Sequence, residues 1–102
     1  MHNVLQCITL YLMDIYSIQW NDDDIAHIAR HGIDPIEVED ICFEKHFANK
    51  GRYGRYVLYG QSHTGRYIKL ILERLYDHVF RTITAYDMTE SEKHNYKSKK
   101  SW

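Results

Sequence analysis

The chain has 102 residues, of which 44% are hydrophobic and 26% are charged, and its formal net charge is −1. This length supports one hydrophobic core and excludes two independent domains, so we expect a single compact domain. The two cysteines, Cys7 and Cys42, fit neither a disulfide framework nor a Cys-x-x-Cys metal or redox pattern. We therefore expect buried free thiols in a reducing, cytoplasmic environment.

The small net charge conceals an uneven distribution along the chain. Residues 1–44 carry nine acidic side chains and one arginine, whereas residues 45–102 carry twelve basic and five acidic side chains. The basic half also contains most of the tyrosines, and this mixture suits a polyanion, because arginine pairs with phosphate and aromatic rings stack on unpaired bases. The alternative is that the two halves neutralise each other across the fold.

Residues 1–14 form an N-terminal extension of uncertain structure. Its apolar residues fit the stripe of a helix through Leu5, Ile8 and Leu12, but some of them also alternate as in a strand. The extension lacks a basic leader and a small-residue cleavage site, and its apolar run is too short to span a bilayer. One interpretation makes Met13 the natural start of the protein.

Alternating side chains predict a short strand over residues 15–20, and a helix follows it. Asn21 or Asp22 is suited to cap this helix, and acidic residues in its first turn match the helix dipole. Gly32 then provides the left-handed residue that ends the helix.

A second helix is predicted directly after Gly32. Asp34 is its cap, Pro35 occupies the first helical position, and Glu37 completes a capping box. The outer side of this helix is acidic, which is typical of a solvated face.

Beyond Lys45 the pattern is that of a sheet. Three strands are predicted over residues 55–60, 66–73 and 79–85, and their short connections imply an antiparallel meander. We expect one face of this sheet to pack on the two helices and the other to remain free for a ligand. Tyr59 is assigned to the core.

The last predicted strand runs directly into a third helix. Thr89 and Glu92 form a capping box that begins it, and residues 98–102 are expected to be a frayed tail. The junction brings Arg81, Tyr86 and the polar first turn of the helix close together, which suits an anionic ligand.

Several separate motifs occur in an order and spacing typical of one protein family. They are Trp20–Asp22, His27–Ile33, Glu37–Glu39, Gly51–Arg55, Gly60, Thr64–Arg66, Arg81–Thr89 and Glu92. Over residues 15–97 the chain resembles the BrnT family, the toxins of type II toxin-antitoxin systems. The resemblance implies a small RelE-like α+β fold, in which N-terminal helices and a C-terminal helix pack on a twisted antiparallel sheet.

The same resemblance implies a cytoplasmic endoribonuclease that acts on RNA without a metal ion or other cofactor. Its partner would be a BrnA-like antitoxin with a ribbon-helix-helix DNA-binding region, so that contact with DNA is indirect. The family's strand commonly ends Ile-Thr/Ser-Ala-Arg, whereas this chain has Tyr86 in place of the arginine. This replacement supports an alternative, a catalytically weak or inactive binding module that acts mainly as the partner of a DNA-binding antitoxin.

Cleaving RNA without metal needs a base for the 2′-hydroxyl, a cation for the developing phosphorane and an acid for the leaving oxygen. His31 is the candidate base, because imidazole changes charge near neutral pH. Arg66 and Arg81 are candidates for holding the phosphate, and Tyr86 is a candidate acid or stacking surface. Strict alternation places Arg81 and Tyr86 on opposite faces of their strand, unless the strand bends between them.

Three further basic residues are candidates for RNA binding. Arg52 and Arg55 are expected to contact RNA or the antitoxin, and Lys69 is expected to contact RNA.

His27 and His31 lie one helical turn apart, a spacing that can bind a metal, but a third ligand is not evident. We therefore predict no metal site.

Overall fold

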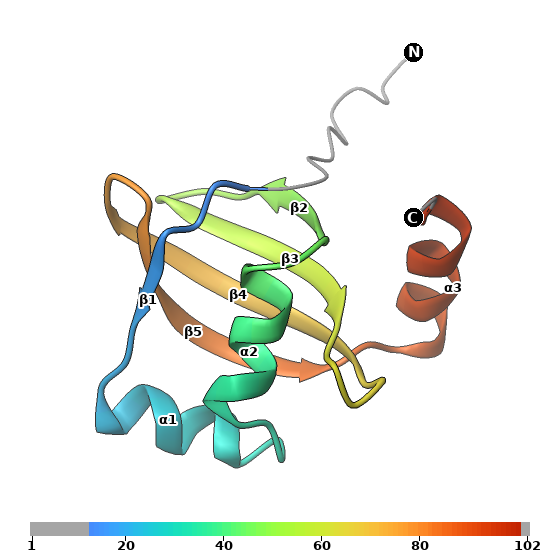
Figure 1. The fold of residues 1–102 in the computed structure, drawn as a ribbon, viewed down its shortest axis with the longest axis horizontal. Helices are drawn as coiled ribbons and strands as arrows, with labels where there is room; N and C mark the ends of the chain where they lie inside the picture. Colours follow the sequence, from blue (N-terminus) through green and yellow to red (C-terminus); the bar gives the residue numbers. More distant parts are fainter. Residues whose placement is uncertain (1–12, 101–102) are drawn as a thin grey trace.

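The computed structural model describes residues 13–100. In chain order its elements are β1 (Ser17–Gln19), α1 (Asp22–Ala29), α2 (Pro35–Cys42), β2 (Phe47–Lys50), β3 (Arg55–Gln61), β4 (Tyr67–Tyr76), β5 (Val79–Asp87) and α3 (Glu90–Lys99). The strands form one sheet in the order β1-β5-β4-β3-β2 (Figure 1). The predicted α+β class is confirmed. Most of the N-terminal extension, including Cys7, lies outside the described residues. The choice between helix and strand for this extension therefore stays a prediction.

The helices begin where the sequence predicts. The Asn21 side chain accepts a hydrogen bond from an amide in the first turn of α1. The capping boxes of Asp34 with Glu37 and of Thr89 with Glu92 are both formed. Helix α3 extends through residues 98 and 99, which the sequence analysis assigned to a frayed tail. None of the helices in the described residues is long and apolar enough to cross a bilayer.

The sheet is mixed, and the prediction of a purely antiparallel sheet is wrong. Strands β3, β4 and β5 form the predicted antiparallel meander, but β1 runs parallel to β5, with Ser17 opposite Val79. Short turns force neighbouring strands to be antiparallel, whereas β1 is distant from β5 in sequence and no turn constrains its direction. Strand β2, which the sequence analysis did not identify, pairs antiparallel with β3 at the other edge.

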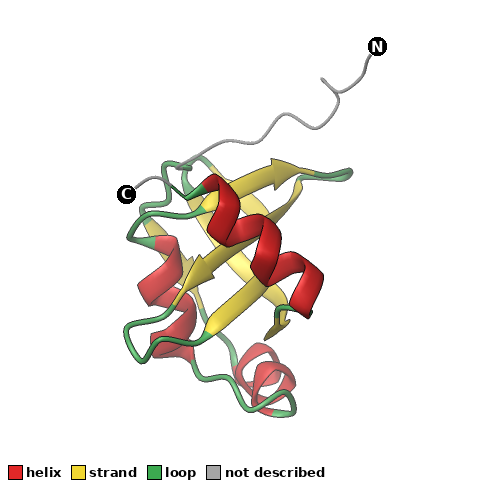
Figure 2. Ribbon diagram, turned by 90° about the vertical axis from the view of Figure 1, so that its right-hand side faces the viewer, coloured by secondary structure: helices red, strands yellow, loops and turns green. Residues whose placement is uncertain are grey.

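Two separate apolar clusters lie on the two faces of the sheet. The larger one joins α1 and α2 to the strands and includes the Cys42 thiol, which is buried and free as predicted, and burial raises its pKa. The smaller one lies under α3, the helix that crosses in front of the strands in Figure 2. There the Tyr96 ring packs edge-on against Phe47 and Tyr67. Helix α3 therefore covers part of the face that was expected to be free for a ligand.

Ion pairs join the acidic and basic halves of the chain. Arg81 of β5 pairs with Asp24 of α1, and Arg66 pairs with Glu37 of α2. The uneven charge distribution is therefore partly neutralised inside the fold, as one of the two interpretations of the sequence anticipated.

His46 is a buried histidine whose ring forms hydrogen bonds with the backbone of three other residues. Its Nε2 lies 2.9 Å from the amide nitrogen of Met13, and its Nδ1 lies 2.9 Å from the carbonyl oxygens of Ile41 and Glu44. An amide can only donate, so Nε2 is the acceptor and the Nδ1 proton is donated to the carbonyls. The ring is thus neutral, and burial, the largest influence, lowers the pKa of His46 despite those carbonyl contacts.

We expect acid to destabilise the protein through His46. A histidine whose pKa is lowered by folding gives its full contribution above its unfolded pKa of about 6.5, and that contribution is lost as the pH falls from there toward the folded value. Thermal melting between pH 7.5 and 5.5 should therefore show a falling Tm, and His46→Gln should flatten the fall. His94→Gln, at an exposed position on α3, is the control. A slope unchanged by His46→Gln would contradict the prediction.

Candidate functional site

A β-bulge in β5 determines which side chains share a face of the sheet. Ile71 of β4 lies opposite Thr84, but the next residue, Leu72, lies opposite Thr82. Ile83 is therefore an extra residue without a direct partner on β4. Each residue inserted into a strand reverses the alternation of the side chains that follow it.

The bulge brings Arg81 and Tyr86 to the same face. Arg81 lies opposite Glu73, and Tyr86 lies opposite Lys69. Glu73 and Lys69 are four residues apart on β4, so their side chains point the same way. Strict alternation put Arg81 and Tyr86 on opposite faces, and the bulge between them corrects this expectation. Both side chains lie on the face of the sheet that α3 partly covers.

Lys69 lies at the centre of this face. The strand register sets Tyr59 on one side of it and Tyr86 on the other, with Nζ 5.9 Å and 5.7 Å from the two ring centroids. The ammonium group also donates a hydrogen bond of 3.0 Å to Glu92 Oε2 on α3. That bond is the main cause that raises the pKa of Lys69. Lys69 is thus a fixed cation between two phenol rings at neutral pH.

Helix α1 and the turn that follows it each bring one histidine to the same part of β5. His31, in the turn that follows α1, has its ring centroid 5.5 Å from that of Tyr86. One helical turn earlier, His27 Nε2 lies 3.1 Å from Thr84 Oγ1. The rings of His27 and His31 are 5.8 Å apart. The predicted base and the predicted acid or stacking residue therefore lie next to each other, although they are distant in sequence.

Arg66 lies near this cluster, but its guanidinium group is already bound. It forms two hydrogen bonds with Asp87, of 2.7 and 3.2 Å, and donates to the backbone carbonyl of His31 at 3.1 Å. It also pairs with Glu37, and the hydrogen bond to Asp87 is the main cause that raises the pKa of Arg66. In this structure Arg66 therefore holds the turn that carries His31. The suggestion from the sequence analysis that Arg66 holds a phosphate stays a prediction.

Arg81 is bound in a similar way. It holds both oxygens of Asp24, at 3.2 and 2.7 Å, and one oxygen of Glu73 at 3.1 Å. The hydrogen bonds to the nearly buried Asp24 are the main cause that raises the pKa of Arg81. A phosphate approaching this guanidinium would also meet two carboxylates, so Arg81 primarily joins α1 to the sheet.

The other predicted RNA-binding residues lie at a turn away from Lys69. Arg52 is in the turn between β2 and β3, and Arg55 begins β3; both are exposed. Arg55 is opposite Glu73, which is in turn opposite Arg81. These three residues form a row across the sheet. It is parallel to the row formed by Tyr59, Lys69 and Tyr86.

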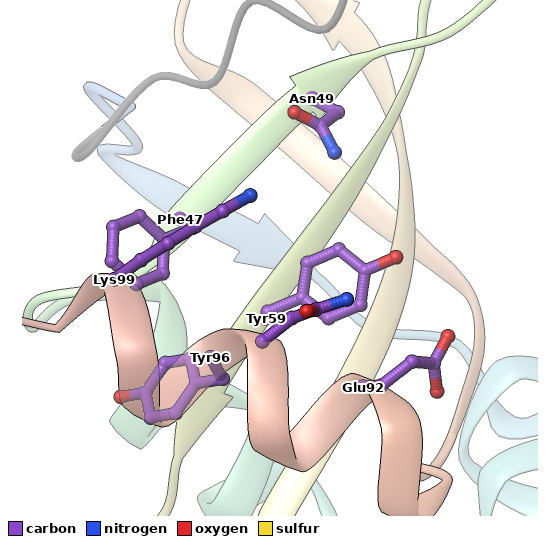
Figure 3. A pocket seen from close by; sticks show the side chains of 7 residues that line it. Phe47, Asn49, Tyr59, Glu92, Tyr96 and Lys99 are labelled. Carbon is purple, nitrogen blue, oxygen red and sulfur yellow. The ribbon is translucent and has the colours of Figure 1, made fainter.

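A pocket of about 220 Å³ lies between α3 and the strands β2 and β3 (Figure 3). Its lining includes Tyr59 and Glu92, both of which also contact Lys69. Tyr59 packs against the smaller apolar cluster, in agreement with its assignment to the core. The sequence analysis missed the contacts of Tyr59 and Glu92 with Lys69. The register of the β3–β4 hairpin could have indicated the contact of Tyr59 with Lys69, because it sets these two residues opposite each other.

Within residues 13–100, no group of three or more histidine, cysteine, aspartate or glutamate side chains is positioned to hold a metal ion. The chemistry that the cluster itself offers is acid-base and electrostatic: an imidazole, a phenol and an ammonium group, each supported by a neighbouring element. Comparison of the whole chain with known protein families and with curated proteins found no match.

Proposed function

We propose that this chain is the toxin component of a type II toxin-antitoxin system, a BrnT-like endoribonuclease with a RelE-like fold that cleaves RNA without a metal ion. The observation that carries the proposal is the meeting of His31, Tyr86 and Lys69 on one face of the sheet. Three different elements supply these side chains, and general acid-base cleavage of RNA requires groups of these kinds. The motif resemblance supports the same function.

In the proposed reaction, His31 removes the proton from the ribose 2′-hydroxyl, whose oxygen then attacks the adjacent phosphorus. The ammonium group of Lys69 offsets the negative charge that develops on the phosphorane oxygens. Tyr86 donates its proton to the leaving 5′-oxygen, or stacks on a neighbouring base. Arg66 is a positioning residue, because it holds the backbone carbonyl of His31 and makes no contact that belongs to the reaction.

The proposed partner is a BrnA-like ribbon-helix-helix antitoxin that neutralises the toxin in the cytoplasm. In this proposal the antitoxin alone contacts DNA, and the toxin contacts DNA only indirectly.

A specific observation favours a second candidate function. Arg66 and Arg81 are both held by carboxylates, and Tyr86 stands where the family motif has an arginine. A site with fewer free cations stabilises the transition state less. The second candidate is therefore a catalytically weak or inactive module whose main role is to bind a DNA-binding antitoxin.

Induced expression in bacteria, with and without the adjacent reading frame, separates the two candidates. Growth and the integrity of total RNA should be followed after confirming that soluble protein is present. The toxin proposal predicts growth arrest with RNA loss, relieved when the neighbouring protein is produced. Normal growth with intact RNA, together with co-purification of the neighbour, would establish the binding module instead.

A further inference from the structure

The turn between β2 and β3 holds a tyrosine in a conformation that tyrosine rarely adopts. Tyr53 has a φ of 59°, and the residue is 86% exposed. Hydrogen bonds close the turn around it, from the Gly51 amide to the Arg55 carbonyl and from the Arg55 amide to the Arg52 carbonyl. A left-handed backbone is unfavourable for a residue with a bulky side chain, whereas glycine accepts it without strain. Strain of this kind concentrates at functional positions.

Two unpaired arginines lie on either side of Tyr53. Among the interactions of the described residues, the guanidinium groups of Arg52 and Arg55 make neither an ion pair nor a hydrogen bond. Arg66, Arg81 and Lys69, in contrast, are each held by a carboxylate. The guanidinium groups of Arg52 and Arg55 are therefore both available to an anionic partner at this turn.

The end of the neighbouring hairpin adds apolar surface beside the turn. The Arg74 amide donates to the Gly54 carbonyl at 2.9 Å, which fixes the end of β4 against the turn. Leu75 and Tyr76, the next two residues, are 40% and 53% exposed. Figure 1 shows both turns at the same end of the sheet. Aromatic and apolar surface with free arginines is the combination that binds single-stranded nucleic acid.

We propose that this turn is a second contact site for single-stranded RNA, separate from the groups that react. Tyr53 stacks on an unpaired base, and Arg52 and Arg55 pair with the phosphates on either side of it. A base in a duplex has both faces covered by its neighbours, so an exposed ring selects unpaired strands. The inference rests on the proposed function for its choice of RNA, and it adds a site that governs affinity rather than the chemical step.

The test uses the full chain and a fluorescein-labelled single strand whose riboses carry 2′-O-methyl groups. Such a strand cannot be cleaved through its 2′-oxygen, so fluorescence anisotropy reports binding alone. Tyr53→Gly should weaken binding by about tenfold or more, the range for loss of one base stack. It should also raise Tm, because glycine relieves the positive φ. Tyr53→Trp should retain binding, since it keeps an aromatic ring.

The arginines are tested by the dependence of binding on salt. Arg52→Ala should lower the slope of log Kd against log salt by about one, which is the loss of one phosphate contact. Lys97→Ala removes the same charge from an exposed position on α3, and it is the matched control. Its slope should stay close to that of the wild type.

Three results would overturn the proposal. The first is equal binding by the wild type, Tyr53→Gly and Arg52→Ala, and the second is no binding by the wild type at all. In the third, Tyr53→Gly binds the strand as the wild type does but is no longer neutralised by the neighbouring protein, which would assign the turn to a protein partner. Cleavage of an unmodified strand of the same sequence is measured separately, so the proposed ribonuclease function stands or fails on its own result.

Discussion

Replacing His31 with glutamine is expected to slow RNA cleavage by about 10²- to 10⁴-fold, the range typical of a lost general base. Glutamine is similar in size and keeps a polar side chain, but it cannot take up a proton near neutral pH. The His31 side chain is exposed and packs against the Tyr86 ring, so the fold should tolerate the change. Single-turnover cleavage of a labelled RNA strand, with Tm measured in parallel, is the appropriate measurement.

His27→Gln is the matched control for His31→Gln. His27 lies one helical turn earlier and is bound to Thr84 Oγ1 at 3.1 Å, a contact that glutamine can also make. We therefore expect a much smaller loss of rate from this change. If His27→Gln costs more than His31→Gln, the base has been assigned to the wrong histidine. If neither variant changes the rate, His31 does not act as the base.

Adding a single methyl group at Gly60 is expected to destabilise the protein by about 1–3 kcal/mol, the usual cost of overpacking a core. A Cβ at this position would lie 2.6 Å from Ile41 Cγ2, which is closer than such atoms can approach, and 3.1 Å from Ile41 Cγ1, which is a tight contact. Gly60 is buried on β3, and the close contact is what lets α2 pack directly on the sheet. Urea unfolding of Gly60→Ala gives the change in free energy of unfolding.

A double-mutant cycle identifies Ile41 as the cause. Ile41→Ala alone should cost about 2–5 kcal/mol, because it leaves a cavity in the core. In the double variant the new methyl group occupies part of that cavity, so the total cost should be clearly less than the sum of the two single costs. Strictly additive costs would show that Gly60 is required for its backbone rather than for its contact with Ile41.

The sequence by itself determined the local parts of this fold. The capping boxes of Asp34 with Glu37 and of Thr89 with Glu92 predicted where α2 and α3 begin, because each involves residues within a single turn. Short connections likewise predicted the antiparallel meander of β3, β4 and β5. Residue type and motif also indicate His31, Tyr86 and Lys69 as candidates, but they do not indicate that these side chains meet.

Only the tertiary structure decided how those residues meet. The parallel pairing of β1 with β5 joins distant segments, and no local pattern encodes its direction. The extra residue at Ile83 reverses the alternation of β5, which a uniform strand pattern cannot reveal. The carboxylate partners of Arg66 and Arg81 include Glu37 and Asp24, from helices distant in sequence. Whether an arginine is free to bind phosphate depends on such long-range contacts, so residue type alone could not separate bracing arginines from the unpaired ones at the β2–β3 turn.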